Sequence, residues 1–215
     1  MTVRIVTDSS ADLPADLVQQ HGITVLPCYV VVDDQTFKDG VEINADDFYR
    51  HLQAEGRTPT TAQPTVADFQ EVYRELTGQG DQVVSIHVSE KLSGTLNSAE
   101  QAKASINEAE IEIIDSQLAS IPLGLAVLDA AINAAEGGNY HDIADKARQG
   151  LGTHHGYFAL DTLVYLHKGG RIGKAQAFMG SILSVKPILK LRNGEAHPVA
   201  RPRNSERAMR RLVEL

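Results

Sequence analysis

The sequence predicts an α/β protein of two lobes, with a mainly parallel sheet in the first lobe and a smaller α+β second lobe. Short apolar runs alternate with helix-like segments over residues 1–160, which is typical of parallel strands joined by helices. Residues 161–215 carry a hairpin pattern instead. The length of 215 residues is enough to bury the core of one large domain or two modest ones. We therefore expect two domains, 1–160 and 161–215.

The first elements follow from apolar runs and turn residues. Residues 3–6 are expected to form a buried strand, and the polar sequence Thr7-Asp8-Ser9-Ser10 follows it directly. A proline near the first turn indicates a helix over residues 12–18. Two strands, a return strand and a helix are expected next, at residues 23–27, 29–32, 36–38 and from 44 onwards.

The middle of the chain predicts two further strand and helix units. Residues 58–64 are expected to be irregular because two prolines bracket the threonines, and Thr65 is expected to cap the helix that follows. Residues 82–88 form the clearest strand pattern. The sequence Ser93-Gly94-Thr95 then leads into a helix over residues 96–106.

The remaining elements complete the first lobe and build the second. A strand at 111–115, an alanine-rich helix up to residue 135, a helix at 140–149 and a strand at 156–160 are expected to close the first lobe. A helix of small residues over 175–183 should end before a proline. Two strands at 188–191 and 196–201, joined by an Asn-Gly turn, and a basic helix at 205–215 follow.

Composition excludes several classes of function. The chain has 20 Lys and Arg against 28 Asp and Glu, so its net charge of −8 argues against a nucleic-acid partner. The one cysteine, Cys28, excludes an internal disulfide or thiolate cluster and favours the cytoplasm; we expect it to be a small core residue. Charged residues interrupt the N-terminal apolar run too soon for a signal peptide, and no apolar run is long enough to span a membrane. We expect a soluble cytoplasmic protein.

Hydroxyl-rich and glycine-rich loops are the candidate binding elements. In Ser93-Gly94-Thr95, glycine permits close approach of the backbone, the hydroxyls can donate, and the next helix supplies free N–H groups. The loop around Thr61 has the same character. Both loops could equally be ordinary helix caps. Their combination on an α/β sheet favours the binding of a carboxylate or phosphate.

Two other loops could either bind a ligand or have a purely structural role. Asp8, Ser9 and Ser10 could support such a pocket, although simple capping explains them as well. No second carboxylate or histidine stands at ligand spacing from Asp8, so we expect no metal. In Gly169-Gly170-Arg171 the guanidinium suits bidentate binding of an anion, or it is a surface arginine beside a glycine turn. No Ser/His/Asp or Cys/His set has a recognisable spacing, which favours holding an anion over attacking one.

The chain resembles the DegV family over nearly its whole length. Five motifs in the family's order carry the resemblance: Thr7-Asp8-Ser9-Ser10-Ala11-Asp12-Leu13, Thr61-Ala62-Gln63-Pro64, Leu92-Ser93-Gly94-Thr95, Asp115-Ser116 and Leu166-His167-Lys168-Gly169-Gly170-Arg171-Ile172. The similarity continues through residues 180–189. The resemblance implies a two-lobed bacterial protein that binds one long-chain fatty acid, for example a palmitate-like one, with the tail buried and the carboxylate at the lobe interface.

The same resemblance implies a partner and a role. Such proteins, called FakB-type subunits, are non-catalytic and need no cofactor. They present the fatty acid to a fatty acid kinase subunit, which uses ATP to form an acyl phosphate for phospholipid synthesis, and a transient membrane-surface contact is expected. Thr61 and Ser93, with Gly94 and Thr95, match the carboxylate-binding positions, and Arg171 matches an arginine of phosphotransfer or partner engagement.

The chain departs from the family pattern in two places. Ala62 stands where the family usually has serine, which removes one hydroxyl from the loop. The family normally continues past the final helix with further strands and helices, whereas this sequence ends at Leu215, so we expect a second lobe that is C-terminally incomplete. Two rival functions remain: a serine hydrolase or phosphotransferase with Ser93 as nucleophile, and a regulatory module that senses a lipid without passing it on.

Overall fold

The first lobe is built on a four-stranded sheet in which every strand is parallel. The computed structural model describes residues 1–53, 59–106, 109–181 and 185–215. The strand order is β2-β1-β6-β7. These strands are β1 (Val3–Asp8), β2 (Thr24–Leu26), β6 (Gln82–His87) and β7 (Ile111–Asp115). The expected parallel sheet of the first lobe is confirmed.

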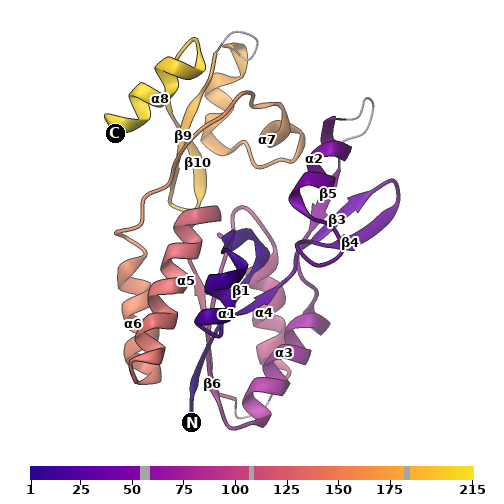
Figure 1. Cartoon of the computed structure of the whole chain (residues 1–215), viewed down its shortest axis with the longest axis vertical. Coiled ribbons are helices and arrows are strands. Elements are labelled where there is room, and N and C mark those ends of the chain that lie inside the picture. The colour runs from indigo at the N-terminus through magenta and orange to yellow at the C-terminus, as the bar shows by residue number, and fades with distance from the viewer. Residues whose placement is uncertain (54–58, 107–108, 182–184) are drawn as a thin grey trace.

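Helices cover both faces of this sheet (Figure 1). One face packs against α3 (Val66–Gly78) and α4 (Thr95–Ala104), and the other against α5 (Ser120–Ala135), α6 (Tyr140–Gly150) and the short α1 (Ala15–Gln20). Alternate residues of β6 enter the two cores, Val83 towards α3 and α4, and Val84 and Ile86 towards α5. Thr65 caps α3 with a reciprocal hydrogen bond to Asp68, as expected.

A small antiparallel sheet projects from the first lobe, on the right of Figure 1. Its order is β4-β3-β5, with β3 (Tyr29–Val32), β4 (Gln35–Lys38) and β5 (Thr60–Ala62), and α2 (Ala45–Gln53) accompanies it. The expectation that residues 58–64 are irregular is therefore wrong for Thr60–Ala62; residue 58 lies outside the described residues. Pro59 and Pro64 flank the strand without entering it, and edge strands tolerate proline at their ends.

The second lobe is a three-stranded antiparallel sheet with short helices. The sheet order is β10-β9-β8, with β8 (Tyr157–Ala159), β9 (Ile188–Arg192) and β10 (Glu195–Ala200). The helices are α7 (Val164–Lys168) and α8 (Ser205–Val213). The strand expected to close the first lobe is β8, and it pairs with β9 in the second lobe instead.

The helix of small residues in the second lobe also differs from expectation. Gly173–Ser181 forms the 3₁₀ helix η2, while Leu183 lies outside the described residues. A 3₁₀ run of this length is uncommon, because its hydrogen-bond geometry is poorer than that of an α-helix. Among the described residues, none of the helices has both the length and the apolar character needed to cross a membrane.

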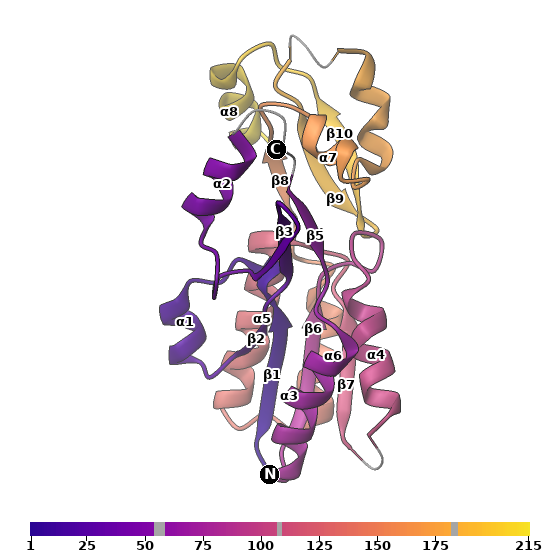
Figure 2. The same ribbon diagram turned by 90° about the vertical axis from the view of Figure 1, so that its right-hand side faces the viewer.

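The two lobes meet at the loop that follows β6 (Figure 2). Ser89 Oγ donates to the carbonyl oxygen of Gly194 at 2.8 Å, and Lys91 Nζ donates to that of Asn193 at 2.8 Å. Both acceptors belong to the turn between β9 and β10, where Gly194 has a φ of +81°. Arg171 adds a third contact, because its Nε donates to the carbonyl oxygen of Leu92 at 2.9 Å.

Candidate ligand-binding site

The candidate site lies where β1 and β6 end side by side. The connection from β1 through α1 to β2 packs on one face of the sheet, and the connection from β6 through α4 to β7 packs on the other. The chain therefore leaves these two neighbouring strands in opposite directions. In open α/β sheets, ligands bind in the crevice that forms at such a switch point, beyond the carboxyl ends of the strands.

A polar cavity of about 260 Å³ occupies this position. It brings together residues from distant parts of the chain, including the hydroxyl residues that the sequence singled out. The lining residues are Ser9, Ser10, Cys28, Asp39, Thr61, Ala62, Gln63, Val88, Leu92, Ser93, Ala119 and Arg171. Thr61, Ser93 and Arg171 thus share one cavity, although more than 100 residues of sequence separate the first from the last.

Gly94 and Thr95 support the cavity without lining it. Thr95 is fully buried, and its hydroxyl and Ser93 Oγ lie 2.8 Å apart in a hydrogen bond. A Cβ atom on Gly94 would lie 2.9 Å from Gln63 Nε2, so glycine lets the Thr61 loop approach the Ser93 loop. Gly94 is the N-cap of α4 and offers no side-chain acceptor, and the N–H of Thr95 donates to Ser93 Oγ at 3.3 Å, so the free N–H groups that a helix start supplies lie further into the first turn.

Asp8 also lies behind the polar cavity. Its Oδ1 accepts hydrogen bonds from the N–H and the hydroxyl of Ser10, and its Oδ2 accepts from His87 Nδ1 at 2.9 Å and from the N–H of Val88 at 3.1 Å. Burial alone would raise the pKa of the Asp8 carboxyl, but the hydrogen bonds and the attraction to His87 outweigh it and lower the pKa. Asp8 is therefore a buried carboxylate that holds the Ser10 turn.

Asp8 belongs to a Ser/His/Asp set that the sequence did not indicate. His87 Nε2 lies 2.6 Å from Ser85 Oγ, and the hydroxyl of Tyr73 donates to Ser85 Oγ at 2.8 Å. All four side chains are fully buried. A substrate cannot reach Ser85, so this arrangement lacks the access that a nucleophile needs. The spacing gave no signal because strand pairing brings Asp8 and His87 together across 79 positions.

Ser9 connects two other groups that line the polar cavity. Ser9 Oγ donates to Asp39 Oδ2 at 2.7 Å and accepts from the N–H of Cys28 at 3.0 Å. Cys28 is only partly buried and faces this cavity, so the expectation of a plain core residue is wrong. Burial, with the nearby charge of Asp8, raises the pKa of the Cys28 thiol to about 11. A thiol of this kind is a poor nucleophile at neutral pH.

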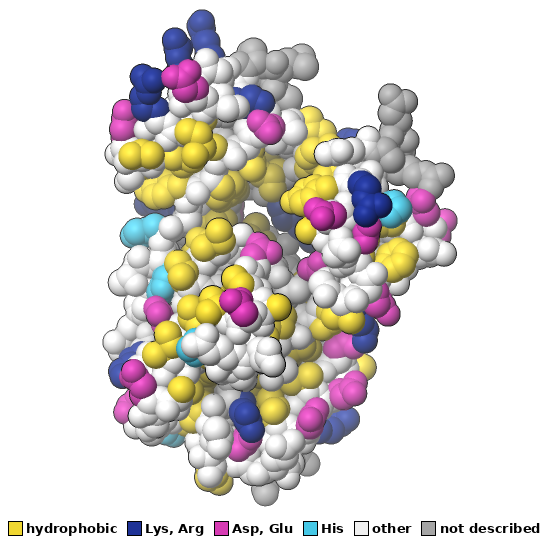
Figure 3. Space-filling model, in the orientation of Figure 1, with side chains coloured by type: hydrophobic (Ala, Val, Ile, Leu, Met, Phe, Trp, Pro, Cys, Tyr) yellow, Lys and Arg dark blue, Asp and Glu magenta, His cyan; other side chains and the backbone are white. Residues whose placement is uncertain are grey.

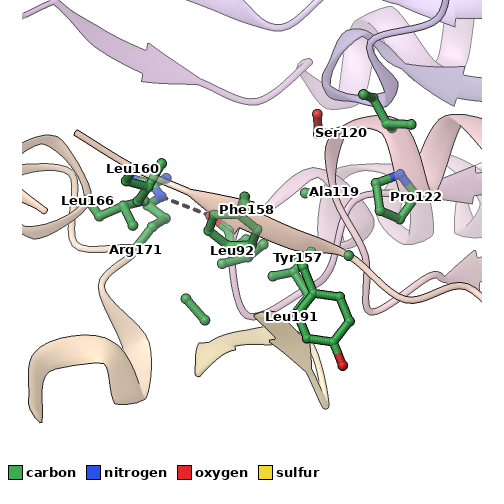
Figure 4. A pocket seen from close by; sticks show the side chains of 13 residues that line it. Leu92, Ala119, Ser120, Pro122, Tyr157, Phe158, Leu160, Leu166, Arg171 and Leu191 are labelled. Carbon is green, nitrogen blue, oxygen red and sulfur yellow. Dashed lines mark hydrogen bonds between the residues drawn. The ribbon is translucent and has the colours of Figure 1, made fainter. Parts of the chain in front are cut away.

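A second, apolar cavity of about 490 Å³ adjoins the polar one. Its walls come from the start of α5, from β8 and from the second lobe around α7 and β9. The lining residues are Leu92, Ala119, Ser120, Ile121, Pro122, Gly156, Tyr157, Phe158, Leu160, Leu166, Arg171, Leu191 and Ala196. In Figure 4, Arg171 and Leu166 lie at one side of this cavity and Pro122 at the other, and the dashed line joins Arg171 to Leu92.

The two cavities share three lining residues: Leu92, Ala119 and Arg171. Figure 3 shows hydrophobic side chains gathered around a hollow between the second lobe and the rest of the molecule. The site therefore combines a hydroxyl-bearing head region with an apolar region of a size typical for small-molecule pockets. Among the described residues, no group of three or more His, Cys, Asp and Glu side chains is placed to hold a metal ion.

The sequence and structure match known proteins over the whole chain. The model of the DegV family, described as an uncharacterised protein family, matches residues 2–215. The chain belongs to the DegV family. A DegV domain-containing protein of Caldanaerobacter subterraneus subsp. tengcongensis is 37% identical to this DegV chain over 212 residues, covering 99% of this chain and 75% of that protein.

Two solved structures share the fold of this DegV chain. A DegV family protein from Thermus thermophilus, described as binding fatty acid, is 36% identical and superposes with a TM-score of 0.93 over 100% of this chain and 76% of its own. A stearic acid-binding protein from Eubacterium ventriosum is 27% identical, with a TM-score of 0.93 over 99% of this chain and 74% of its own. The two-lobed DegV architecture expected from the sequence is confirmed.

Proposed function

We propose that this protein binds a long-chain fatty acid, with its acyl tail in the apolar cavity and its carboxylate in the polar cavity. The observation that carries the proposal is that these two cavities adjoin and share Leu92, Ala119 and Arg171. A ligand that is apolar along its length and anionic at one end matches this division. The fatty-acid binding described for the relatives from Thermus thermophilus and Eubacterium ventriosum supports it.

The energetics of such a ligand divide between the two cavities. Each buried methylene contributes roughly 0.8 kcal/mol, so the tail supplies most of the affinity. The head is held by neutral donors: the hydroxyls of Thr61 and Ser93 and the N–H groups at the start of α4. Arg171 lines both cavities, which puts a fixed positive charge near the expected carboxylate. The head is therefore oriented by hydrogen bonds and charge.

We further propose that the bound fatty acid is presented to a fatty acid kinase subunit and phosphorylated there to an acyl phosphate. This role makes the protein a non-catalytic carrier without a cofactor, acting in the cytoplasm, where phospholipid synthesis would use the product. Arg171 would then serve phosphotransfer or contact with the partner. A transient contact with a membrane surface that supplies the ligand is part of the same proposal, and two exposed apolar residues four positions apart on α5, Ile121 and Leu125, support it.

Two measurements test these steps separately. Native mass spectrometry of the purified protein should show a co-purified lipid, or a one-to-one complex after palmitate is added. Reconstitution with ATP and a fatty acid kinase subunit should then yield an acyl phosphate. If the complex forms but no acyl phosphate appears, the protein is a lipid sensor and the carrier role is wrong.

The serine hydrolase alternative is tested by a fluorophosphonate probe. Among the described residues, the hydrogen-bond partners of the Ser93 hydroxyl are the hydroxyl and N–H of Thr95, and neither is a base. We expect no labelling of Ser93. A stoichiometric adduct at Ser93 would contradict the carrier function.

A further inference from the structure

The wall of the polar cavity at Ser9 and Ser10 is held from behind by the buried Asp8 carboxylate. Asp8 Oδ1 is used entirely by Ser10, through its N–H at 3.1 Å and its hydroxyl. Asp8 Oδ2 receives His87 Nδ1 and the N–H of Val88. A buried carboxylate needs all of these donors, because an ion left unpaired in a protein interior is strongly destabilised. The orientation of Asp8 therefore depends on His87.

His87 is itself fixed by groups deeper in the core. Ser85 Oγ accepts from the hydroxyl of Tyr73, so its own proton is directed at His87 Nε2, which lies 2.6 Å away, and His87 Nδ1 faces Asp8 Oδ2 at 2.9 Å. The Phe69 ring lies edge-on to the imidazole, with centroids 5.0 Å apart and planes at 86°. Hydrogen bonds thus connect Asp8, His87, Ser85 and Tyr73 in series, and the series ends at Tyr73, which is fully buried.

The burial of Tyr73 limits the roles that this series of hydrogen-bonded side chains can have. A proton route needs an exit to solvent, and a nucleophile needs access to substrate; neither is present at Tyr73 or Ser85. What remains is orientation: donors and acceptors run in one direction from Tyr73 to Asp8, and Asp8 fixes the turn that lines the cavity. Hydrogen-bonded supports of this kind hold binding groups in their working geometry.

We propose that Asp8 and His87, supported by Ser85 and Tyr73, are positioning residues that set the shape of the polar cavity through the Ser9–Ser10 turn. Ser9 transmits the effect, because its hydroxyl joins Asp39 to the backbone of Cys28 across the same cavity. Loss of the His87 donor leaves Asp8 Oδ2 with one partner, and the carboxylate then reorients or takes up a proton. Either change releases Ser10.

Cys28 provides a readout that needs no lipid. It is the one cysteine of the chain and lines the polar cavity, so its alkylation by iodoacetamide at a fixed alkaline pH, where part of the thiol is ionised, reports on the state of the Ser9–Ser10 turn. In His87→Ala we expect alkylation about tenfold faster than in the wild type, the change typical of losing one hydrogen bond to a charged group. His87→Asn retains an N–H donor towards Asp8 and should restore the slow rate.

A matched control separates positioning from general loosening of the sheet. Ile86 is the neighbour of His87 on β6, is fully buried and points to the opposite core. Ile86→Val should leave the alkylation rate of Cys28 at its wild-type value. If His87→Ala is unfolded by circular dichroism, Ser85→Ala removes the donor to Nε2 instead and should accelerate alkylation in the same direction.

The second readout, palmitate affinity, rests on the proposed function. We expect His87→Ala to weaken binding about tenfold, and His87→Asn and Ile86→Val to bind like the wild type. If the wild type binds no fatty acid, the proposed function fails while the alkylation test of positioning still stands. Equal alkylation rates in the wild type and in a folded His87→Ala or Ser85→Ala variant would overturn the positioning role, as would acceleration by Ile86→Val.

Discussion

Ser93 and Thr61 reach the same cavity from the loop after β6 and from the strand β5, and the two segments approach each other where Gln63 lies against Gly94. The hydroxyl of Ser93 already pairs with that of Thr95, so one of its hydrogen-bonding positions is used and its orientation is restricted. Thr61 lies on β5, opposite Val30 in the antiparallel pairing, and is exposed to the cavity side of the small sheet. Both positions suit a hydroxyl that donates to a carboxylate.

The hydroxyls of Ser93 and Thr61 are each expected to contribute one hydrogen bond to a charged head. Ser93→Ala or Thr61→Ala should weaken palmitate binding by about 1.5–3 kcal/mol, roughly ten- to hundredfold in Kd by isothermal titration. Matched controls are Ser105→Ala at the far end of α4 and Thr77→Ala near the end of α3, whose hydroxyls bond to backbone carbonyls outside the cavity. Unchanged affinity in both cavity variants would remove the site assignment.

The Asp8 carboxylate should make stability fall in acid. Its pKa is lowered from the ordinary 3.8 by folding, so its contribution is present above the pKa of the unfolded chain and is lost as pH falls through the folded pKa. We expect the free energy of unfolding to decrease below about pH 4, and Asp8→Asn to flatten this decrease. Denaturant titrations from pH 7 to pH 2 measure both slopes. Identical slopes would contradict a lowered pKa at Asp8.

At the scale of single residues, the sequence indicates chemistry better than contacts. Hydroxyl and glycine loops after strands pointed to Ser9, Ser10, Thr61 and Ser93, and the structure places all four on one cavity. The pairing of Asp8 with His87 gave no signal, because it depends on the register between β1 and β6. Contacts that depend on strand register cannot be predicted from the spacing of residues along the sequence.

Most elements follow from periodicity, and the exceptions share a physical cause. Strands β1, β6 and β7 and helices α3 to α6 match their apolar patterns because burial on the sheet imposes those patterns. Thr60–Ala62 was expected to be irregular, yet backbone pairing with β3 makes it a strand, although all three of its side chains are exposed. The partner of β8 was likewise decided by a distant strand, β9. Short strands therefore depend on tertiary pairing more than on their own sequence.

The hairpin between β9 and β10 gives a test at the level of elements. Gly194 and Gly80 have the same φ of +81°, but only at Gly194 would a Cβ atom clash, with Ser89 Oγ at the lobe contact; the space around Gly80 is open. Gly80→Ala should cost about 1–2 kcal/mol from backbone strain alone. Gly194→Ala should cost more, because Ser89 must also move. Chemical denaturation compares the two variants.

The same pair of variants separates docking from strain. Ser89 begins the loop that carries Leu92 and Ser93, so Gly194→Ala should also weaken fatty-acid binding, whereas Gly80→Ala should not. Equal unfolding free energies in the two variants, with equal ligand affinity, would show that the hairpin tip does not hold this loop in place.

At the scale of the molecule, the site exists because two lobes meet over one sheet edge. The first lobe supplies the hydroxyl loops at the ends of β1 and β6, and the second supplies β8, α7 and Arg171, which close the apolar cavity. Three contacts on the loop after β6, from Gly194, Asn193 and Arg171, hold the lobes in this relation. The division into a polar and an apolar chamber is therefore a property of the assembly of lobes.

The junction of the two chambers offers a direct substitution. Ala119 lines both cavities and precedes α5 with extended backbone, which accepts a larger residue without strain. Ala119→Phe should obstruct the passage and abolish palmitate binding while leaving the unfolding midpoint within a few degrees of the wild type. Ala135→Phe, at the exposed end of the same helix, is the control. Full palmitate affinity in Ala119→Phe would show that the ligand does not run between the chambers.

The most direct measurement is a crystal structure of the protein with bound palmitate. We expect the carboxylate within hydrogen-bonding distance of the hydroxyls of Thr61 and Ser93, and the tail running past Ala119 and Leu92 to lie against Phe158. Density for the carboxylate in the apolar cavity, or for a tail that lies outside the space between α5 and β8, would contradict the account.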